Sequence, residues 1–95
     1  MDILEQLQNS RVKKTELSRG EIRWACRRGM LELDILLGDY FDAHFDELTS
    51  TDKKIFETLV ALPDQLLYEY FTGKISPDDP GIARVFKKIC DAAGR

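Results

Sequence analysis

The chain has 95 residues, of which 43% are hydrophobic and 33% are charged, so its length suits one compact domain and leaves no room for a second. Its formal net charge of −3 argues against a protein that coats phosphate backbones, because nucleic-acid affinity depends largely on clustered cations. No apolar run approaches the roughly 20 residues that cross a bilayer, and the first residues lack the pattern of a secretion signal or a transit peptide. We therefore expect a soluble protein of a bacterial-type cytoplasm, without membrane insertion.

Apolar residues recur with the period of a helix in almost every segment, and no segment alternates polar and apolar residues for long enough to indicate a strand. Residues 1–17 mix apolar and charged side chains and are expected to form an N-terminal extension, either a short helix or a frayed arm. The first firm helix should begin near Ser18, because Ser18 and Glu21 have the spacing of a capping box. It should end near Gly29. The predicted domain therefore comprises residues 18–95.

A longer helix is predicted from about Met30 to Phe45, with an acidic face opposite its apolar stripe. The only histidine, His44, falls on or beside the stripe, so a packed core histidine is expected rather than a general base. The acidic residues are interpreted as a solvated face rather than a metal site, and the aromatic residues as core rather than a flavin-stacking box. The stripe consists of Leu33, Leu36, Leu37, Tyr40, Phe41, His44 and Leu48.

Three further helices are indicated by their start signals. The run from Thr49 to Asp52 offers N-cap candidates for a third helix. Pro63 suits the first turn of a fourth helix that stops near Gly73, and the pair Asp79-Pro80 opens a fifth. Their apolar stripes are Ile55, Phe56, Leu59 and Val60; Leu66, Leu67, Tyr70 and Phe71; and Ile82, Val85, Phe86, Ile89 and Cys90. The sequence therefore predicts an all-α fold, a single compact bundle of about five short helices.

The two cysteines do not indicate a metal site. Cys26 and Cys90 lie far apart in the sequence and lack both the CxxC spacing and the companion ligands of a zinc site. We expect them to be reduced and mostly buried. No metal site and no catalytic residue is predicted, because no nucleophile with a recognisable base accompanies the single histidine.

The segment from Ile22 to Asp34 holds the densest mixture of cations, aromatic residue and glycine, and it is the best candidate for a functional surface. Arg19, Arg23 and Arg27 repeat every four residues, so on a helix they lie along one side. Two interpretations stay open for them: an ordinary solvated face, or a surface that binds an anionic partner or a phosphate.

Arg28 and Glu32 lie four residues apart across the expected junction of two helices, where an exposed ion pair is worth at most about 0.5 kcal/mol. Gly29 removes a side chain between them. Such a glycine either permits a left-handed backbone at a helix end or lets the backbone of another protein approach closely, and helix termination is the more common reason.

The run from Trp24 to Asp34 closely resembles the signature of the succinate dehydrogenase assembly factor family, called SdhE in bacteria. The hallmark of that family is an Arg-Gly-x-x-Glu motif, which the chain carries at Arg28, Gly29 and Glu32. The similarity continues through the last helix and covers roughly residues 21 to 90. The resemblance implies a small helical bundle that promotes covalent attachment of FAD to a histidine of the flavoprotein subunit of succinate dehydrogenase, and often of fumarate reductase.

The resemblance also implies roles for individual residues and partners. The partner-binding and flavinylation motif would be Arg28, Gly29 and Glu32, with flanking contacts from Trp24, Arg27, Met30 and Asp34. The FAD belongs to the partner, so we expect no cofactor to be bound stably by this chain. The chain is expected to be a monomer and not an enzyme, an assembly factor that aligns the acceptor histidine and the flavin within the flavoprotein.

Two rival functions stay open. Proteins similar to this one have also been regarded as antitoxins of the CptB type, which would make the chain a binder that opposes a toxin. A nucleic-acid adaptor is motivated by Arg11, Lys13, Lys14 and the arginine series from Arg19 to Arg28, although the net negative charge leads us to expect no nucleic-acid partner.

Overall fold

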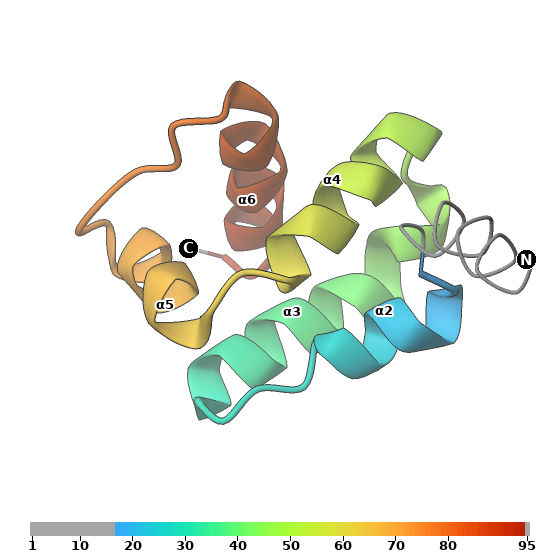
Figure 1. The fold of residues 1–95 in the computed structure, drawn as a ribbon, viewed down its shortest axis with the longest axis horizontal. Coiled ribbons are helices and arrows are strands. Elements are labelled where there is room, and N and C mark those ends of the chain that lie inside the picture. The colour runs from blue at the N-terminus through green and yellow to red at the C-terminus, as the bar shows by residue number, and fades with distance from the viewer. Residues whose placement is uncertain (1–16, 95) are drawn as a thin grey trace, which may run out of the picture.

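The computed structural model describes residues 17–94, so residues 1–16 of the predicted N-terminal extension lie outside the described part of the chain (Figure 1). The described elements are α2 (Arg19–Ala25), α3 (Leu31–His44), the 3-10 helix η1 (Phe45–Glu47), α4 (Ser50–Val60), α5 (Asp64–Thr72) and α6 (Pro80–Ala92). No strand occurs between residues 17 and 94. The predicted all-α bundle of five short helices is thereby confirmed. None of these helices has the length and apolar character that a bilayer crossing needs.

Polar residues start α2, α4 and α6 where the sequence predicted them, whereas α3 and α5 begin after Met30 and Pro63 without a side-chain cap. Ser18 accepts the backbone N–H of Glu21 at 3.1 Å, and the carboxylate of Glu21 accepts the N–H of Ser18 at 2.8 Å, so the capping box is confirmed. The hydroxyl of Thr49 caps α4, and the carboxylate of Asp79 caps α6, with Pro80 at the first position of that helix. Each cap satisfies backbone donors that have no partner within the helix.

The first helix is shorter than predicted. It ends at Ala25, and Cys26 closes its last turn in a right-handed conformation by donating its N–H to the carbonyl oxygen of Arg23 at 3.1 Å. The prediction that Gly29 ends this helix is therefore wrong, because a residue with a side chain completes the turn. Gly29 does not have a positive φ, unlike Gly73, which ends α5 at φ 80° as predicted.

The helices enclose one apolar core. α2 and α3 lie side by side and run in opposite directions, α4 and α6 pack together across them, and α5 covers the end at which α3 begins (Figure 1). The aromatic side chains of α3 and η1 belong to this core, as predicted; the ring centroids of Phe41 and Phe45 are 4.5 Å apart. The buried cluster consists of Ile22, Cys26, Leu33, Leu36, Leu37, Tyr40, Phe41, Phe45, Phe56, Leu59, Val60, Leu67, Ile82, Val85, Phe86 and Ile89.

One carboxylate is buried at the contact between α4 and α6. Oδ1 of Asp52 accepts a hydrogen bond from Nη1 of Arg84 at 2.7 Å, and Oδ2 accepts one from Nζ of Lys88 at 3.0 Å. The hydrogen bonds from Arg84 and then Lys88 hold the pKa of Asp52 below its ordinary value. The two charge-assisted contacts therefore join the two helices at a specific register.

His44 is not the packed core residue that the sequence predicted. Its side chain is 44% exposed, and its Nδ1 lies 4.0 Å from a carboxylate oxygen of Glu47. The ring centroid is 5.0 Å from that of the buried Tyr40. His44 is the last residue of α3, where the apolar stripe reaches the edge of the bundle, so one side of the ring covers the core while the rest remains at the surface.

Candidate functional site

The candidate segment forms a corner of the molecule. It comprises the end of α2, the loop that follows and the first turns of α3, and we call residues 24–35 the α2–α3 corner. Of the seven residues that the sequence singled out, four are exposed on this corner and three point inward. The exposed residues are Trp24, Arg27, Gly29 and Glu32, and the inward ones are Arg28, Met30 and Asp34.

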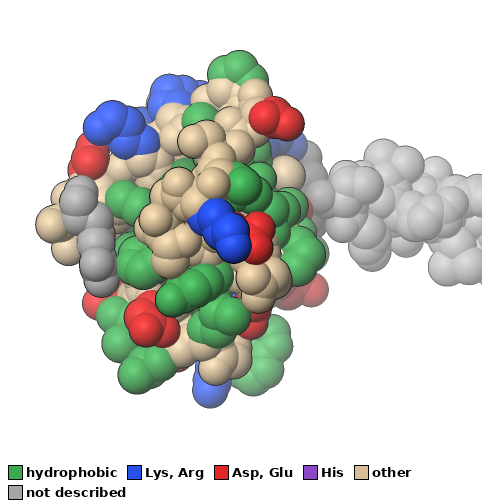
Figure 2. Space-filling view, turned by 90° about the vertical axis from the view of Figure 1, so that its left-hand side faces the viewer, with side chains coloured by type: hydrophobic (Ala, Val, Ile, Leu, Met, Phe, Trp, Pro, Cys, Tyr) green, Lys and Arg blue, Asp and Glu red, His purple; other side chains and the backbone are tan. Residues whose placement is uncertain are grey.

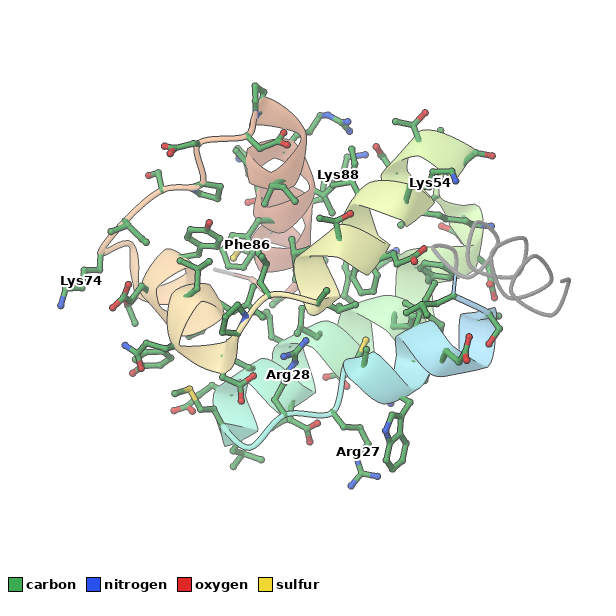
Figure 3. The ribbon with its side chains drawn as sticks, in the orientation of Figure 1. Arg27, Arg28, Lys54, Lys74, Phe86 and Lys88 are labelled. Atoms are coloured by element: carbon green, nitrogen blue, oxygen red, sulfur yellow. The ribbon has the colours of Figure 1, made fainter. Side chains whose placement is uncertain are left out.

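Arg28 is bound within the protein. Its side chain is only 11% exposed, and it points into the body of the molecule, whereas the neighbouring Arg27 points away from it (Figure 3). Nη1 of Arg28 donates to the carbonyl oxygen of Leu62 at 3.1 Å and to Oδ1 of Asp64 at 2.9 Å, and Nη2 donates to the carbonyl oxygen of Val60. The two terminal nitrogens of this arginine are therefore occupied by acceptors of the chain itself, whereas its buried Nε has no hydrogen-bond partner among the described residues.

The position of Arg28 follows from the charges at two helix ends. The carbonyl groups of Val60 and Leu62 lie at the C-terminus of α4, where a cation is favourable. Asp64 is the first residue of α5, where an anion is favourable. Arg28 and Asp64 therefore complement both helix ends as well as each other, and their ion pair fixes the corner to the connection between α4 and α5.

The other inward residues also hold the loop in place. Oδ1 of Asp34 accepts the backbone N–H of Arg28 at 3.1 Å, and Met30 packs against the buried core. Arg28 and Glu32 do not form an ion pair, because Arg28 turns inward to Asp64. Within the described part of the chain, the exposed carboxylate of Glu32 makes no hydrogen bond or ion pair, and it lies in the first turn of α3.

Gly29 is required neither by its backbone conformation nor by crowding. A Cβ built on Gly29 would meet, among the described residues, only Oδ2 of Asp64, at the ordinary contact distance of 3.9 Å. The N–H of Gly29 is 3.4 Å from the same oxygen. Of the two explanations that the sequence left open, the left-handed helix end is excluded, and the bare surface at Gly29 remains available for close approach by another molecule.

Large apolar side chains surround this bare surface. Trp24 is 69% exposed and Leu31 is 68% exposed, and Ile35 lies exposed one turn further along α3. The guanidinium of Arg27 lies 5.1 Å from the centroid of the Trp24 ring, a cation–π contact. Seen from the end where α5 and the start of α3 lie, hydrophobic side chains gather on the lower half of the surface with acidic ones among them (Figure 2).

Sequence reasoning missed Leu31, Ile35 and Asp64. Leu31 and Ile35 are apolar residues that lie outside the predicted apolar stripe of α3. Their position outside the stripe was a sequence signal that they are exposed. Asp64 was not considered, and no local signal marks it, because its partner Arg28 is 36 residues away in the sequence.

The arginine series on α2 is paired rather than free. Arg19 makes two hydrogen bonds to the carboxylate of Asp46, at 2.8 and 3.0 Å, and Arg23 makes two to Asp42, at 2.9 and 3.2 Å. The hydrogen bond from Arg19 also holds the pKa of Asp46 below its ordinary value. Arg19 and Arg23 remain exposed, with 57% and 38% of their side chains accessible, so they fit an ordinary solvated face on which the acids of α3 and η1 neutralise them.

A groove of about 390 Å³ runs beside the corner, between α3 and the end of α6. Its walls are mainly apolar, and its charged lining residues include two acids, Glu32 and Asp39, and no lysine or arginine. This lining does not match an anionic group such as a pyrophosphate. The groove is lined by Glu32, Ile35, Leu36, Asp39, Tyr40, Ala43, His44, Phe71, Ile89, Ala92 and Ala93.

The cysteines are free thiols, as predicted, with Cys26 fully buried and Cys90 partly buried. Burial raises the pKa of the Cys26 thiol to about 11, so this thiol is protonated at neutral pH and is a poor nucleophile. Between residues 17 and 94, no group of three or more His, Cys, Asp or Glu side chains is arranged to hold a metal ion.

Comparison with known proteins covers the whole bundle. The family model described as "Flavinator of succinate dehydrogenase" matches residues 20–93. The FAD assembly factor SdhE of Coxiella burnetii is 44% identical over 73 residues, which are 77% of this chain and 89% of that protein. The protein of the same name from Shewanella oneidensis is 40% identical over 68 residues, 72% of this chain and 83% of the relative. The FAD assembly factor SdhE of Methylococcus capsulatus is 36% identical over 77 residues, which are 81% of this chain and 93% of that protein.

Proposed function

The chain belongs to the family of flavinators of succinate dehydrogenase, and on that premise we propose that it is a FAD assembly factor that docks on the flavoprotein subunit of succinate dehydrogenase. Docking through the α2–α3 corner promotes the covalent attachment of FAD to that subunit. The flavoprotein subunit of fumarate reductase is a second substrate of the same kind. The chain acts as a monomer in the cytoplasm.

The observation that carries this proposal is that some residues of the motif segment hold the loop from inside while others are exposed. Arg28 and Asp34 hold the loop from inside, while Gly29 and Glu32 are exposed on it. A bare backbone, a carboxylate without an internal partner and exposed apolar side chains together suit a protein–protein contact, in which apolar anchors are ringed by polar groups. Trp24 is the strongest anchor, because aromatic residues are enriched among the side chains that dominate binding energy.

The contribution of this chain to the reaction is positioning. The acceptor histidine and the bound flavin both belong to the partner, so the helper needs no catalytic side chain of its own. Holding two groups in a reactive geometry can lower a barrier by roughly 7 to 11 kcal/mol. The groove on this chain is a poor site for FAD, because Glu32 and Asp39 in its lining would repel the pyrophosphate of the cofactor. This supports a FAD site on the partner.

The test is to delete the gene and to measure covalent flavin in the flavoprotein subunit. After denaturing electrophoresis, only covalently bound flavin still fluoresces in the protein band. We expect the fluorescence to fall strongly in the deletion strain and to return when the wild-type chain is supplied. Undiminished covalent flavin without this chain would contradict the proposal.

Affinity capture distinguishes the rival antitoxin function. A tagged chain should capture a flavoprotein subunit, and substitutions at exposed corner residues such as Glu32 should weaken the capture. Capture of a small toxin through the same residues, with no flavoprotein, would favour the antitoxin function instead.

A further inference from the structure

We propose that Asp64, which lies outside the motif, is a positioning residue of the docking surface and that Arg28 stays paired with it inside the protein while the partner is bound. This inference rests on the proposed function and assigns the motif arginine an internal role. Asp64 and Arg28 set the shape of the loop, and Gly29 and Glu32 then meet the partner.

The two oxygens of Asp64 serve two neighbouring residues of the loop. Oδ1 accepts a hydrogen bond from Nη1 of Arg28 at 2.9 Å, and Oδ2 lies 3.4 Å from the N–H of Gly29. One carboxylate therefore fixes both the direction of the arginine side chain and the backbone of the glycine. Since a glycine backbone has more conformational freedom than that of any other residue, a hydrogen bond to its N–H restricts the conformations open to it.

The base of this arrangement is rigid. Asp64 begins α5 directly after Pro63, whose ring fixes one backbone angle, and α5 packs against α3 on the side where α3 begins. Arg28 is also held by the carbonyl oxygens of Val60 and Leu62, which do not depend on Asp64. Removing the carboxylate should therefore loosen Gly29 without releasing the whole loop.

Burial argues against a role for Arg28 at the partner surface. To reach a partner, its guanidinium would have to leave three acceptors, and the carbonyl oxygens at the end of α4 would lose a cation in a poorly hydrated site. Arg27 is the cation that already points outward and needs no rearrangement (Figure 3).

The first experiment compares Asp64→Asn with the matched control Asp42→Asn. Asp42 is also paired with an arginine, since it accepts two hydrogen bonds from Arg23, but it lies away from the corner. Purified flavoprotein subunit loaded with FAD is mixed with increasing amounts of each variant, and the rate of covalent flavin formation is measured. For Asp64→Asn we expect the concentration of the variant that gives half of the maximal rate to rise about ten-fold, while the maximal rate stays unchanged. A ten-fold rise corresponds to a loss of about 1.4 kcal/mol in binding free energy. Asp42→Asn should behave as the wild type.

The wild-type arm of this assay separates the two proposals. If the wild-type chain does not accelerate covalent flavin formation, the proposed function fails. If the wild-type chain accelerates it and a folded Asp64→Asn variant saturates at the wild-type concentration, the function stands and the positioning role of Asp64 is overturned. Equal losses in both variants would also overturn it, because the effect would then not be specific to the corner.

A second measurement uses the wild-type chain and does not depend on whether the variant folds. The amide signal of Gly29 and the guanidinium signals of Arg28 are followed by nuclear magnetic resonance while unlabelled flavoprotein subunit is added. We expect the Gly29 amide to shift and the Arg28 side-chain signals to keep their positions and their protection from solvent exchange. Large changes in the Arg28 signals would show that this arginine leaves Asp64 for the partner, and the proposal would be wrong.

Discussion

Nη1 of Arg28 donates a hydrogen bond of 3.1 Å to the carbonyl oxygen of Leu62, 34 residues later in the chain. This contact joins the α2–α3 corner to the end of α4, and the same guanidinium also binds Val60 and Asp64. One side chain therefore links the α2–α3 corner to the connection between α4 and α5.

Replacing Arg28 with lysine should destabilise the fold. An ammonium group keeps the charge and has three donors, but all three leave a single nitrogen and cannot reproduce the geometry of the planar fork, and hydrogen bonds to charged groups are worth about 1.5 to 3 kcal/mol. We expect the free energy of unfolding to fall by roughly that amount in urea denaturation followed by circular dichroism. The control is Arg27→Lys at the neighbouring exposed position, which should change stability little. Equal stability of the two variants would contradict the structural role of Arg28.

Bulk at Gly29 should impair docking without unfolding the protein. Its φ is not positive and a Cβ has room, so Gly29→Ala should change the free energy of unfolding by less than about 1 kcal/mol. Gly29→Leu should keep the helical spectrum but lose most of the stimulation of covalent flavin formation, because the side chain would hold the partner away.

The matched control for Gly29→Leu is Gly20→Leu on α2, where a Cβ would meet nothing within 4 Å. This variant adds the same side chain away from the corner and should retain full activity. A fully active Gly29→Leu variant would rule out close approach of the partner at this glycine.

Glu32 should matter for docking and hardly at all for stability. Its carboxylate makes no hydrogen bond or ion pair with the described residues and gains only the favourable field at the start of α3, about 0.3 to 1 kcal/mol. We therefore expect Glu32→Gln to unfold within about 1 kcal/mol of the wild type and to bind the flavoprotein subunit much more weakly in titration calorimetry. Asp39→Asn, an exposed acid that lines the same groove, is the control and should bind normally. Similar affinities for both variants would count against Glu32 as a contact.

The contribution of Asp52 to stability should depend on pH. Because its folded pKa is lowered by Arg84 and Lys88, its contribution is complete above the unfolded pKa of about 3.9 and is lost as the pH falls through the lower folded value. At pH 7, Asp52→Asn should cost roughly 1 to 3 kcal/mol, since charged hydrogen bonds between α4 and α6 are lost.

The measurement is a set of urea denaturation curves for the wild type and Asp52→Asn between pH 7 and pH 2. The difference in unfolding free energy should stay constant down to about pH 4 and then shrink as the wild-type carboxylate gains its proton. A difference that grew at acid pH would show that the folded pKa is raised instead of lowered.

Local sequence signals predicted most of the fold because they act over a few residues. The capping box at Ser18, the cap at Thr49 and the left-handed Gly73 all appear where expected, since each depends on neighbours within four positions. The predicted end of the first helix was wrong although it also rested on a local signal. Gly29 resembled a helix terminator, but Cys26 had already closed the turn.

The sequence by itself determined that the chain is an all-α bundle and which segment carries its family motif, because helix period, caps and an uninterrupted run of residues are local properties. Only the tertiary structure decided which motif residues face outward. Arg28 turns inward because α4 ends and α5 begins directly opposite it, bringing carbonyl oxygens and the Asp64 carboxylate within reach. These acceptors come from more than 30 residues away, and the charge at a helix end can attract a side chain only once folding has placed the two together.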